Sequence, residues 1–582
     1  MIDATGSRLW VMSSRPFEFE STPTGTKVRV RVRGNDVLAI PLINRGTAFT
    51  KAQRDSLRLN GLMPSGIVSI EGQISRVYQQ FLEQPDALSK NVYLSAMRDR
   101  NEVLFYRLLA EHLEEMLPIV YTPTIGEAIQ RYSHWYSRPR GVFLSIDDPD
   151  GIENAFLNYG LEPEDVDLVV ATDSEGILGI GDQGVGGVQI AIGKLSVYTA
   201  AAGIHPRRAI PVVLDVGTDN LALLNDELYL GVRHARVRGE RYDAFIDTFV
   251  EVTTRLYPKA MLHWEDFGAS NAHRILDRYR NDICTFNDDV QGTAAVVAAA
   301  ALAGVKATGE RMSDQRIVVH GAGTAGVGIA NLLRDIMIRE GSSPEEANAR
   351  FWCLGSRGLI TEALGDRVRP FQKPYARTDA DVQGWRLDVE GRIGLADVVR
   401  NTHPTILIGT SGQPGTFTEA IVRDMAAHTR NPIIMPLSNP TSLSEGVPER
   451  IVDWTHGKAM IATGSPFAPV TFHQRTYEIA QANNALVFPG LGLGVAVCGA
   501  SRVSDGMIAA ASEAIAGISQ VTRPEMPLLP SIRQLRYVSA TVALAVVRAA
   551  QEEGLATVEV DEPVQAVYQR MWHPVYPDLE VV

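Results

Sequence analysis

The order of apolar and polar residues along the chain predicts a helical stretch followed by alternating strands and helices. From about residue 45 to 135 the pattern is mainly helical, and residues 101–109 space their apolar side chains along one helix face. Residues 118–124 contain two prolines and predict a short extended piece, because a proline restricts the residue before it. Residues 28–33 alternate Val with Arg, and this period of two predicts a strand or an edge hairpin.

From about residue 167 onward, short apolar runs that predict buried strands alternate with helical patterns such as residues 241–256. This alternation predicts an α/β protein with a parallel, doubly wound sheet. Residues 293–305 are mostly Ala and Val, and this run is too short to span a membrane, so it predicts a buried helix. The predicted strands are residues 167–172, 209–216, 261–264, 316–320, 351–354, 405–409, 432–437, 459–462 and 485–488.

Composition narrows the class of protein. Of the 582 residues 45% are apolar and 21% are charged, which is ordinary for a folded protein and excludes a disordered, collagen-like or disulfide-scaffolded chain. The net charge of −13 argues against general nucleic-acid binding. The N-terminus has acidic residues and no continuous apolar run, so no signal peptide is expected. Cys284, Cys353 and Cys498 form no CxxC pair, which fits buried thiols in a reducing compartment.

A glycine motif predicts a dinucleotide site. Residues 321–326, Gly-Ala-Gly-Thr-Ala-Gly, follow a predicted strand and precede a predicted helix over 327–339, and this context gives the motif its meaning. The first glycine permits a tight turn, the second lets the backbone approach a pyrophosphate, and the third allows close helix packing. The helix N-terminus adds N–H donors. The residues predicted to bind the dinucleotide here are Gly321, Gly323, Thr324, Ala325 and Gly326.

The second strand of such a fold usually ends in an acidic residue that binds the ribose 2′-hydroxyl. In this chain the strand ends in Gly355, and Ser356 and Arg357 follow it. A hydroxyl and a guanidinium suit a 2′-phosphate, so the sequence predicts NADP at least as readily as NAD. The alternative is that Arg357 is a solvated turn residue.

A second glycine-rich stretch is not expected to bind phosphate. Residues 179–184 also match GxGxxG, but Asp182 inside the loop would repel a phosphate. Gly193-Lys194 resembles the end of a P-loop, but the chain lacks the Gly and the Ser or Thr that a P-loop requires. We therefore exclude an ATP site in this stretch.

Two acidic pairs, Glu265-Asp266 and Asp288-Asp289, are flanked by aromatic residues. Carboxylates in apolar settings are costly unless they are paired or bind a metal, and such oxygen donors suit Mg²⁺ or Mn²⁺. The alternative is two solvated turns. Lys194 lies in an apolar stretch, where burial could lower its pKa and make it a base, although a surface lysine with a buried stem is the alternative.

Taken together, these motifs resemble the malic enzyme family over about residues 41–550. Their order and spacing are specific in combination, although each is ambiguous alone. The matching motifs are Gly46-Thr47-Ala48-Phe49-Thr50, Tyr121-Thr122-Pro123-Thr124, Leu178-Gly179-Ile180-Gly181-Asp182, Gly193-Lys194-Leu195, Leu214-Asp215-Val216-Gly217-Thr218, Glu265-Asp266-Phe267, residues 286–293, Ser438-Asn439-Pro440-Thr441 and Asn483-Asn484.

The resemblance implies oxidative decarboxylation of L-malate to pyruvate and CO₂, with reduction of NAD or NADP and dependence on Mg²⁺ or Mn²⁺. It assigns the base that takes the C2 hydroxyl proton to Lys194, the acid that protonates the enol carbon to Tyr121, and the tuning of Lys194 to Asp288. The metal ligands that the resemblance implies are Glu265, Asp266 and Asp289. The side chains that it implies for positioning substrate and nicotinamide are Asn439 and Asn484.

One position departs from the family pattern. Many members have an Arg before the Ile-Leu-Gly motif, where it binds a malate carboxylate, and this chain has Gly176. Loss of a charge-assisted pair costs affinity unless another cation replaces it. Residues 174–179 and 263–267 also resemble the malolactic enzymes, which convert L-malate to lactate and CO₂ with NAD retained. Tyr121-Thr122-Pro123-Thr124 and the acid-free Gly355 favour the malic enzyme alternative. A sensor that has lost catalysis should lack Lys194, Tyr121 or the acids, and all are present.

The resemblance also implies an organisation and a setting. We expect a cytoplasmic homodimer or homotetramer that acts on a small molecule and binds neither nucleic acid nor membrane. The expected fold is a helical N-terminal region and substrate domain followed by a Rossmann-type domain. The predicted boundaries are an N-terminal extension at 1–40, a substrate and metal domain at 41–290, an NAD(P)-binding domain at 291–560 and a C-terminal tail at 561–582.

Overall fold

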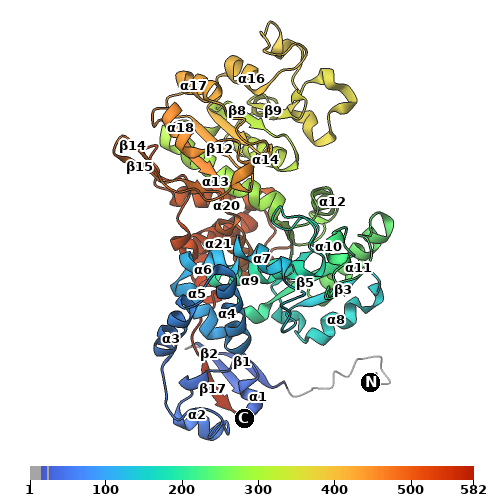
Figure 1. Cartoon of the computed structure of the whole chain (residues 1–582), viewed down its shortest axis with the longest axis vertical. Coiled ribbons are helices and arrows are strands. Elements are labelled where there is room, and N and C mark those ends of the chain that lie inside the picture. The colour runs from blue at the N-terminus through green and yellow to red at the C-terminus, as the bar shows by residue number, and fades with distance from the viewer. Residues whose placement is uncertain (1–14, 23–24) are drawn as a thin grey trace. The chain divides into compact units, whose positions relative to one another are not determined.

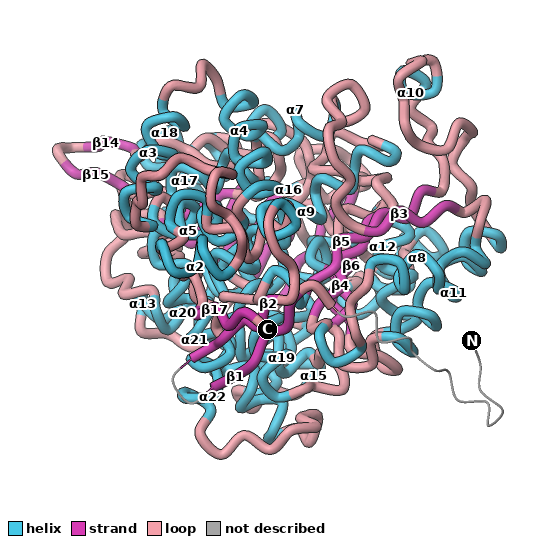
Figure 2. The backbone as a smooth tube through the Cα atoms, turned by 90° about the horizontal axis from the view of Figure 1, so that it is seen from below, coloured by secondary structure: helices cyan, strands magenta, loops and turns pink. Residues whose placement is uncertain are grey.

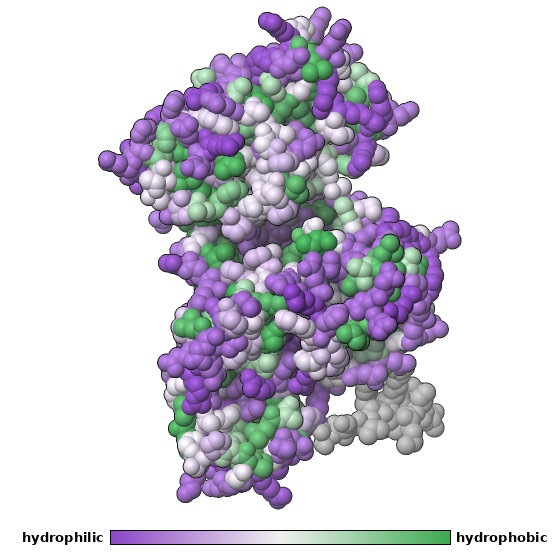
Figure 3. Space-filling model, in the orientation of Figure 1, coloured by the Kyte–Doolittle hydropathy of each residue, from purple (hydrophilic) through white to green (hydrophobic). Residues whose placement is uncertain are grey.

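The computed structural model describes residues 15–22 and 25–582, so most of the segment that bears on a signal peptide lies outside the described residues. The chain forms two compact units. The first comprises residues 1–128 with 572–582, and the second comprises residues 129–571. Figure 1 shows the elements of both units, coloured along the chain. On the face drawn in Figure 3, hydrophilic residues predominate and apolar ones form small scattered patches.

A three-stranded sheet in the first unit joins the two ends of the chain. β1 (Phe17–Thr22) pairs antiparallel with β2 (Gly25–Val30), and β17 (Asp578–Val581) pairs parallel with β2 on its other side. The strand predicted over 28–33 is confirmed for residues 28–30, where Val28 and Val30 are fully buried, and is wrong for 31–33, which follow β2. The strand is central and not at an edge, since a partner more than 540 residues away in sequence completes the sheet.

Helices make up the rest of the first unit. The predicted helix over 101–109 is confirmed as α5, which Asn101 caps by accepting a hydrogen bond from the Leu104 N–H at 3.0 Å. The extended piece expected from residue 118 is wrong for 118–120, which belong to α6. Four apolar residues of α6 are buried, and this burial outweighs the one hydrogen bond that Pro118 removes. The helices are α1 (Asn35–Leu38), α2 (Lys51–Ser56), α3 (Ile70–Leu82), α4 (Ala87–Arg100), α5 (Glu102–Glu111), α6 (Leu113–Val120) and, at the boundary of the units, α7 (Thr124–Gln130).

The second unit begins with a five-stranded parallel sheet in the order β3-β5-β4-β6-β7, whose first four strands can be followed side by side in Figure 2. Strands β4 to β7 are buried along their whole length, which explains their continuous apolar sequences. The strands are β3 (Val142–Ser145), β4 (Leu168–Thr172), β5 (Ala209–Asp215), β6 (Met261–Trp264) and β7 (Thr285–Asn287). The helices are α8 (Ile152–Tyr159), α9 (Val188–Ala202), α10 (Leu221–Leu224), α11 (Glu240–Leu256) and α12 (Ala269–Tyr279).

A seven-stranded sheet follows, in the order β10-β9-β8-β11-β12-β13-β16. All neighbouring strands are parallel except β10 and β9. Strand β8 has β9 on one side and β11 on the other, so the order of strands reverses direction at β8. Doubly wound sheets bind ligands in the crevice at such a point of reversal. The strands are β8 (Ile317–His320), β9 (Phe351–Gly355), β10 (Gly358–Leu359), β11 (Ile406–Gly409), β12 (Ile433–Pro436), β13 (Met460–Thr463) and β16 (Ala480–Gln481), with a separate hairpin of β14 (Val470–Phe472) and β15 (Arg475–Tyr477).

Eight of the nine predicted strands match, and the strand expected at 485–488 is wrong. The chain there forms a 3₁₀ turn, η12 (Asn484–Leu486), and then begins a helix at Phe488. Pro489 suits the first turn of a helix, where its missing N–H has no partner to lose. The apolar run belongs to a helix that is buried all round, and such a run has the same composition as a buried strand.

Buried helices rich in small residues fill the space beside the two sheets. The predicted buried helix is confirmed as α13, which packs against α14 and α20. Among the described residues, 288–308 form one helical stretch long and apolar enough to cross a membrane, but 72% of its apolar window is buried inside the protein, as in a core helix. The helices are α13 (Thr293–Thr308), α14 (Thr324–Arg339), α15 (Pro344–Asn348), α16 (Leu395–Thr402), α17 (Glu419–His428), α18 (Pro448–Trp454), α19 (Phe488–Cys498), α20 (Asp505–Ile518), α21 (Leu535–Glu552) and α22 (Pro563–Arg570).

Candidate active site

Both acidic pairs lie at the carboxyl edge of the five-stranded sheet. Glu265 and Asp266 directly follow β6, and Asp288 and Asp289 directly follow its neighbour β7. Parallel strands place their carboxyl ends at one edge, so the fold brings together the four acids that the sequence suggested. Glu265, Asp266 and Asp288 are at most 5% exposed, which excludes the alternative of two solvated turns.

Local structure explains how the second pair is presented. The Asn287 side chain accepts a hydrogen bond from the Val290 N–H at 3.0 Å and begins a helical turn over Asp288–Gly292. A carboxylate at a helix N-terminus is favoured by the helix dipole. A Cβ on Gly292 would lie 2.1 Å from Asp288 Oδ1, so only glycine leaves room for this carboxylate.

Lys194 is buried among these acids. It lies in the middle of α9, and its Nζ is 2.7 Å from Glu265 Oε1 and 2.6 Å from Asp288 Oδ2. The ammonium also lies over the Phe488 ring, 4.3 Å from its centroid. The lysine is 0% exposed, which excludes the alternative of a surface lysine. Lys194 is therefore held by two carboxylates in a medium of low polarity, where each contact is strong.

Two further residues, which the sequence reasoning missed, support Glu265. The Tyr198 hydroxyl is 2.8 Å from His263 Nδ1, and His263 Nε2 is 2.9 Å from Glu265 Oε2. Burial, and then the charge of Lys194, lowers the pKa of His263 to about 3, so the imidazole is neutral. The sequence places each residue near a known member of the site, His263 two residues before Glu265 and Tyr198 one helical turn after Lys194, but it does not show their contact.

The first acidic pair is fixed by backbone groups. Asp266 has a φ of 53°, a left-handed conformation that Asp tolerates better than most residues. Its carboxylate accepts a hydrogen bond from the Leu178 N–H at 3.0 Å, and its own N–H donates to Asp289 Oδ2 at 2.9 Å. Burial raises the pKa of Asp266 well above its usual range, and the charges of Asp289 and Glu265 raise it further. Burial and then Glu265 and Asp288 raise the pKa of Asp289 to about 8.

The donor set fits a divalent cation. Four carboxylates face one ammonium, and Asp288 Oδ1 is buried without a hydrogen-bond partner among the described residues. Oxygen donors of this kind suit Mg²⁺ or Mn²⁺. His263, Glu265 and Asp288 also bring their ligand atoms within 4.8 Å of one another, but both ring nitrogens of His263 are already hydrogen-bonded, to Tyr198 and to Glu265. The predicted set of Glu265, Asp266 and Asp289 stays the candidate for the metal.

The position of the missing clamp is closed by backbone. A Cβ on Gly176 would lie 2.6 Å from the Phe267 carbonyl oxygen, and the Gly176 N–H donates to the Asp266 carbonyl at 2.9 Å. An arginine therefore does not fit at 176 without a backbone shift. The buried Arg236 does not replace it, since its Nε donates to Asp182 Oδ2 at 2.9 Å and its Nη1 to the Asp173 carbonyl at 2.8 Å. Asp182, which excluded a phosphate from its loop, is held by this ion pair.

The glycine motif at the carboxyl end of β8 has the geometry that its predicted roles require. Gly321 has a φ of 111°, and a Cβ there would lie 2.4 Å from the Thr410 carbonyl carbon at the end of β11. A Cβ on Gly323 would meet nothing within 4 Å, which leaves the backbone open to a ligand. A Cβ on Gly326 would lie 2.3 Å from the Gly321 carbonyl oxygen, so α14 packs closely. Thr324 and Ala325 form the first turn of α14.

The remaining predicted residues occupy different places. Asn484 joins the carboxylate cluster, because its Nδ2 donates to Asp288 Oδ2 at 3.0 Å and to Thr293 Oγ1 at 3.2 Å. Asn439 is exposed after β12, where the Ser465 hydroxyl donates to its side-chain oxygen. Ser356 and Arg357 are exposed in the turn after β9. Tyr121 belongs to the first unit, where it ends α6 and is 6% exposed, and its role at the site stays a prediction.

Comparison with known proteins gives the same assignment from both halves of the chain. Residues 98–280 match the family model described as "Malic enzyme, N-terminal domain", and residues 290–551 match "Malic enzyme, NAD binding domain". The chain is 54% identical to the NAD-dependent malic enzyme 3 of Bacillus subtilis, over 97% of this chain and 100% of that one. It is 48% identical to the NAD-dependent malic enzyme of Sodalis glossinidius, over 94% and 96% of the two chains.

Solved structures agree on the fold. The malic enzyme from Pyrococcus horikoshii gives a TM-score of 0.54 at 23% identity and covers 79% of this chain and 89% of its own. The malic enzyme of Entamoeba histolytica gives a TM-score of 0.54 at 20% identity, over 89% and 91% of the two chains. The expected α/β fold with a Rossmann-type domain is thereby confirmed.

Proposed function

The chain belongs to the malic enzyme family, and from this premise we propose that the carboxylate cluster around Lys194 is where it converts L-malate to pyruvate and CO₂. The enzyme is a decarboxylating malate dehydrogenase that uses NAD. The observation that carries the assignment of the site is the buried Lys194, placed between Glu265 and Asp288 at the sheet edge. The four buried carboxylates carry more negative charge than the one ammonium of Lys194 balances, so a bound cation would stabilise the site.

Each group of the cluster has a distinct task in this proposal. Lys194 first releases the proton of its resting ammonium to solvent, then takes the proton from the C2 hydroxyl of malate, and Asp288 accepts a hydrogen bond from the ammonium that forms again. When bound, a divalent cation held by Glu265, Asp266 and Asp289 would act as a Lewis acid on the C2 oxygen, and NAD would accept the hydride from C2. The β-keto acid then loses its carboxylate as CO₂, and Tyr121 gives a proton to the carbon left behind. Asn484 fixes the Asp288 carboxylate and so the direction of Lys194 Nζ.

NAD is the cofactor, and the exposed Arg357 after β9 stays available to contact the 2′-phosphate of NADP. We expect initial rates to saturate at lower NAD⁺ than NADP⁺. Arg357→Ala should weaken any residual use of NADP⁺ and leave the use of NAD⁺ unchanged, because only NADP⁺ carries the extra phosphate. A preference for NADP⁺ in the unchanged enzyme would restore the sequence-based expectation that Ser356 and Arg357 bind it.

The test of function mixes the purified protein with L-malate, Mn²⁺ and NAD⁺, and follows reduced cofactor, pyruvate and lactate in one reaction. We expect NADH and pyruvate to appear in equal amounts, and Lys194→Ala to abolish both. Formation of lactate without net NADH would overturn the proposal in favour of the malolactic reaction, which nothing in the names of the relatives supports. Variant Arg357→Ala serves as the matched control for expression and folding.

We further infer a cytoplasmic homodimer or homotetramer whose substrate is the small molecule L-malate. The cysteines fit the buried thiols expected from the sequence: burial raises the pKa of Cys353 to about 12 and that of Cys498 to about 11, so both stay protonated and unreactive. Light scattering after size-exclusion chromatography measures the oligomeric state. A monomer at the protein concentration of the activity assay would contradict the inferred homodimer or homotetramer.

A further inference from the structure

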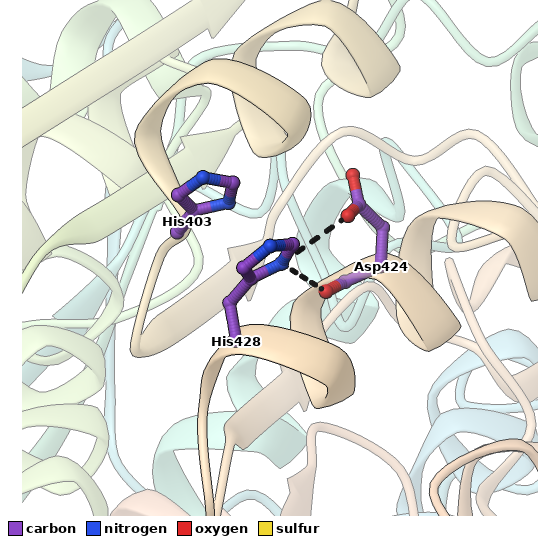
Figure 4. A group of neighbouring side chains, drawn as sticks. All are labelled: His403, Asp424 and His428. Atoms are coloured by element: carbon purple, nitrogen blue, oxygen red, sulfur yellow. Dashed lines mark hydrogen bonds and ion pairs between the residues drawn. The ribbon is translucent and has the colours of Figure 1, made fainter.

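A group of metal-ligating side chains lies outside the carboxylate cluster, between helices α16 and α17. Figure 4 shows His403, Asp424 and His428, whose candidate ligand atoms all lie within 4.8 Å of one another. Asp424 and His428 are one turn apart on α17, so both side chains share one helix face. His403 follows the last residue of α16 and approaches from the neighbouring helix. We propose that these three residues form a second metal site, which binds a divalent transition-metal ion of borderline softness such as Zn²⁺.

His403 is placed as a ligand. Its Nδ1 is buried and has no hydrogen-bond partner among the residues that the structure describes. Its φ of 46° is a left-handed conformation at the end of a helix, where glycine or asparagine is the usual residue. Histidine adopts this conformation more readily than most residues, so the buried Nδ1 without a partner is the observation that points to a ligand.

His428 is oriented by a contact typical of metal-binding imidazoles. Its Nδ1 is 3.0 Å from the Asp424 carbonyl oxygen and 3.4 Å from Asp424 Oδ1, so Nε2 is the ring nitrogen that a metal would bind, and the carboxylate would turn from Nδ1 to the ion. The rings of His403 and His428 stack with centroids 3.7 Å apart and planes 23° apart. Stacked rings direct their lone pairs in parallel, so chelation needs a rotation of one imidazole about its side-chain bond.

Charged groups of both signs lie around His403. Neutral imidazole is the form that binds metals. Arg316 is the facing cation, but its Nη2 donates to the His403 carbonyl at 2.6 Å, so it is bound to the backbone at the end of α16. The carbonyl ends of α16 and α17 add negative potential.

The donor set distinguishes this site from the catalytic one. Two imidazole nitrogens and one carboxylate oxygen suit Zn²⁺ or Co²⁺, whereas Mg²⁺ and Mn²⁺ prefer oxygen donors alone. His403 precedes β11 and His428 precedes β12, so the group lies at the amino edge of the seven-stranded sheet. The glycine motif follows β8 at the opposite, carboxyl edge. A bound ion would therefore cross-link α16 and α17 without touching the reacting atoms.

The test measures Zn²⁺ binding by titration calorimetry on the full-length protein with the carboxylates saturated by Mg²⁺. His403→Asn tolerates the left-handed conformation, and His428→Gln keeps the helix, so both variants should fold. His456→Asn is the matched control, because His456 also has a left-handed φ, of 51°, two residues after a helix, and belongs to no such group among the described residues. Asp289→Asn removes a candidate catalytic ligand and leaves this site intact.

We expect the unchanged protein, His456→Asn and Asp289→Asn each to bind one equivalent of Zn²⁺ that His403→Asn and His428→Gln lose. Zn²⁺ should also raise the thermal unfolding midpoint of the first three proteins and not of the last two, since a metal that binds only the folded chain stabilises it. Equal Zn²⁺ stoichiometry in all five proteins would overturn the proposal. Loss of the extra equivalent in Asp289→Asn alone would assign the Zn²⁺ to the carboxylate cluster and also overturn it.

Discussion

The buried imidazole of His263 links the Tyr198 hydroxyl to a carboxylate that also contacts Lys194. We predict that Tyr198→Phe weakens Mn²⁺ binding and lowers kcat, by about 10–100-fold, as outer partners of metal ligands usually do. The variant leaves His263 Nδ1 buried without a partner, which costs about 1–3 kcal/mol of stability and lets Glu265 move. Steady-state rates against Mn²⁺ concentration measure both effects.

The control for this prediction is another buried tyrosine. Tyr477→Phe removes a hydroxyl that donates to the Gly457 carbonyl at 3.2 Å, in a core cluster that contains none of the four carboxylates. It should cost stability without changing the Mn²⁺ dependence. A positioning role for Tyr198 is refuted if the two variants show the same Mn²⁺ dependence as the unchanged enzyme.

Gly176 is constrained by the Phe267 carbonyl and by its own bond to Asp266. We predict that Gly176→Ala destabilises the protein by about 1–3 kcal/mol, as overpacking of a tight site does, and reduces activity because Asp266 shifts. Gly176→Arg should not restore a clamp. A Gly66→Ala control, whose Cβ would meet nothing within 4 Å, should be neutral. A lower KM for malate in Gly176→Arg would show that the backbone yields and that the family clamp can be rebuilt.

Some residues of the site could be predicted from a single sequence, and others could not. The acids could be found because pairs of carboxylates beside aromatic residues are unusual, and the glycine loop because strand and helix patterns flank it. Tyr198 and His263 were missed because their contact joins a helix to a strand 65 residues away, and only tertiary packing shows it. The roles given to Tyr121 and Asn439 came from resemblance, and they stay predictions.

Secondary-structure elements were predictable where sequence period and burial agree. Parallel strands such as β4 and β6 are short apolar runs between turn residues, and their bounds matched closely. Helix α19 was mistaken for a strand because it is apolar on every side, so it has no period to distinguish it. The glycines of α19 are the sequence feature that identifies it as a helix in close contact with another, because they let it approach α21.

The close contact of α19 with α21 predicts that a glycine-to-alanine change has opposite effects on stability in α19 and in α20. A Cβ on Gly490 of α19 would lie 2.6 Å from the Ser539 carbonyl oxygen and from Val542 Cβ of α21, so Gly490→Ala should cost about 1–3 kcal/mol. Gly517 lies in α20, and its Cβ would meet nothing within 4 Å. Gly517→Ala should therefore add about 0.4–1 kcal/mol by restricting the unfolded chain. Thermal unfolding midpoints that fall in both variants would contradict the packing argument.

At the scale of the whole molecule, the ends of the chain belong to one sheet. Residues 1–40 and 561–582 were predicted as an extension and a tail, because each looks peripheral when read alone. The pairing of β17 with β2 has no local signature, since Lys27 and Glu580 meet only after the intervening chain has folded. Local sequence patterns predict helices, strands and candidate sites. They do not predict which strand β17 pairs with, and only the structure shows this pairing.

Stability of the whole enzyme should depend on pH through the carboxylate cluster. The pKa of Asp289 is raised to about 8, so the folded chain keeps a proton that the unfolded chain releases. This contribution to stability is fully present below the unfolded pKa and is lost as pH rises through about 8. A divalent cation binds the ionised carboxylates, so it should stabilise the enzyme more at higher pH.

We therefore predict that the thermal unfolding midpoint of the metal-free enzyme falls between about pH 6 and about pH 9, and that saturating Mg²⁺ removes most of this fall. Asp289→Asn should fall less without metal and gain less from Mg²⁺, because an amide neither titrates nor binds the ion as strongly. Calorimetric scans of both proteins at each pH, with and without Mg²⁺, give four curves to compare. If Mg²⁺ raises the midpoint equally at every pH and in both proteins, the ion acts elsewhere and Asp289 is not its ligand.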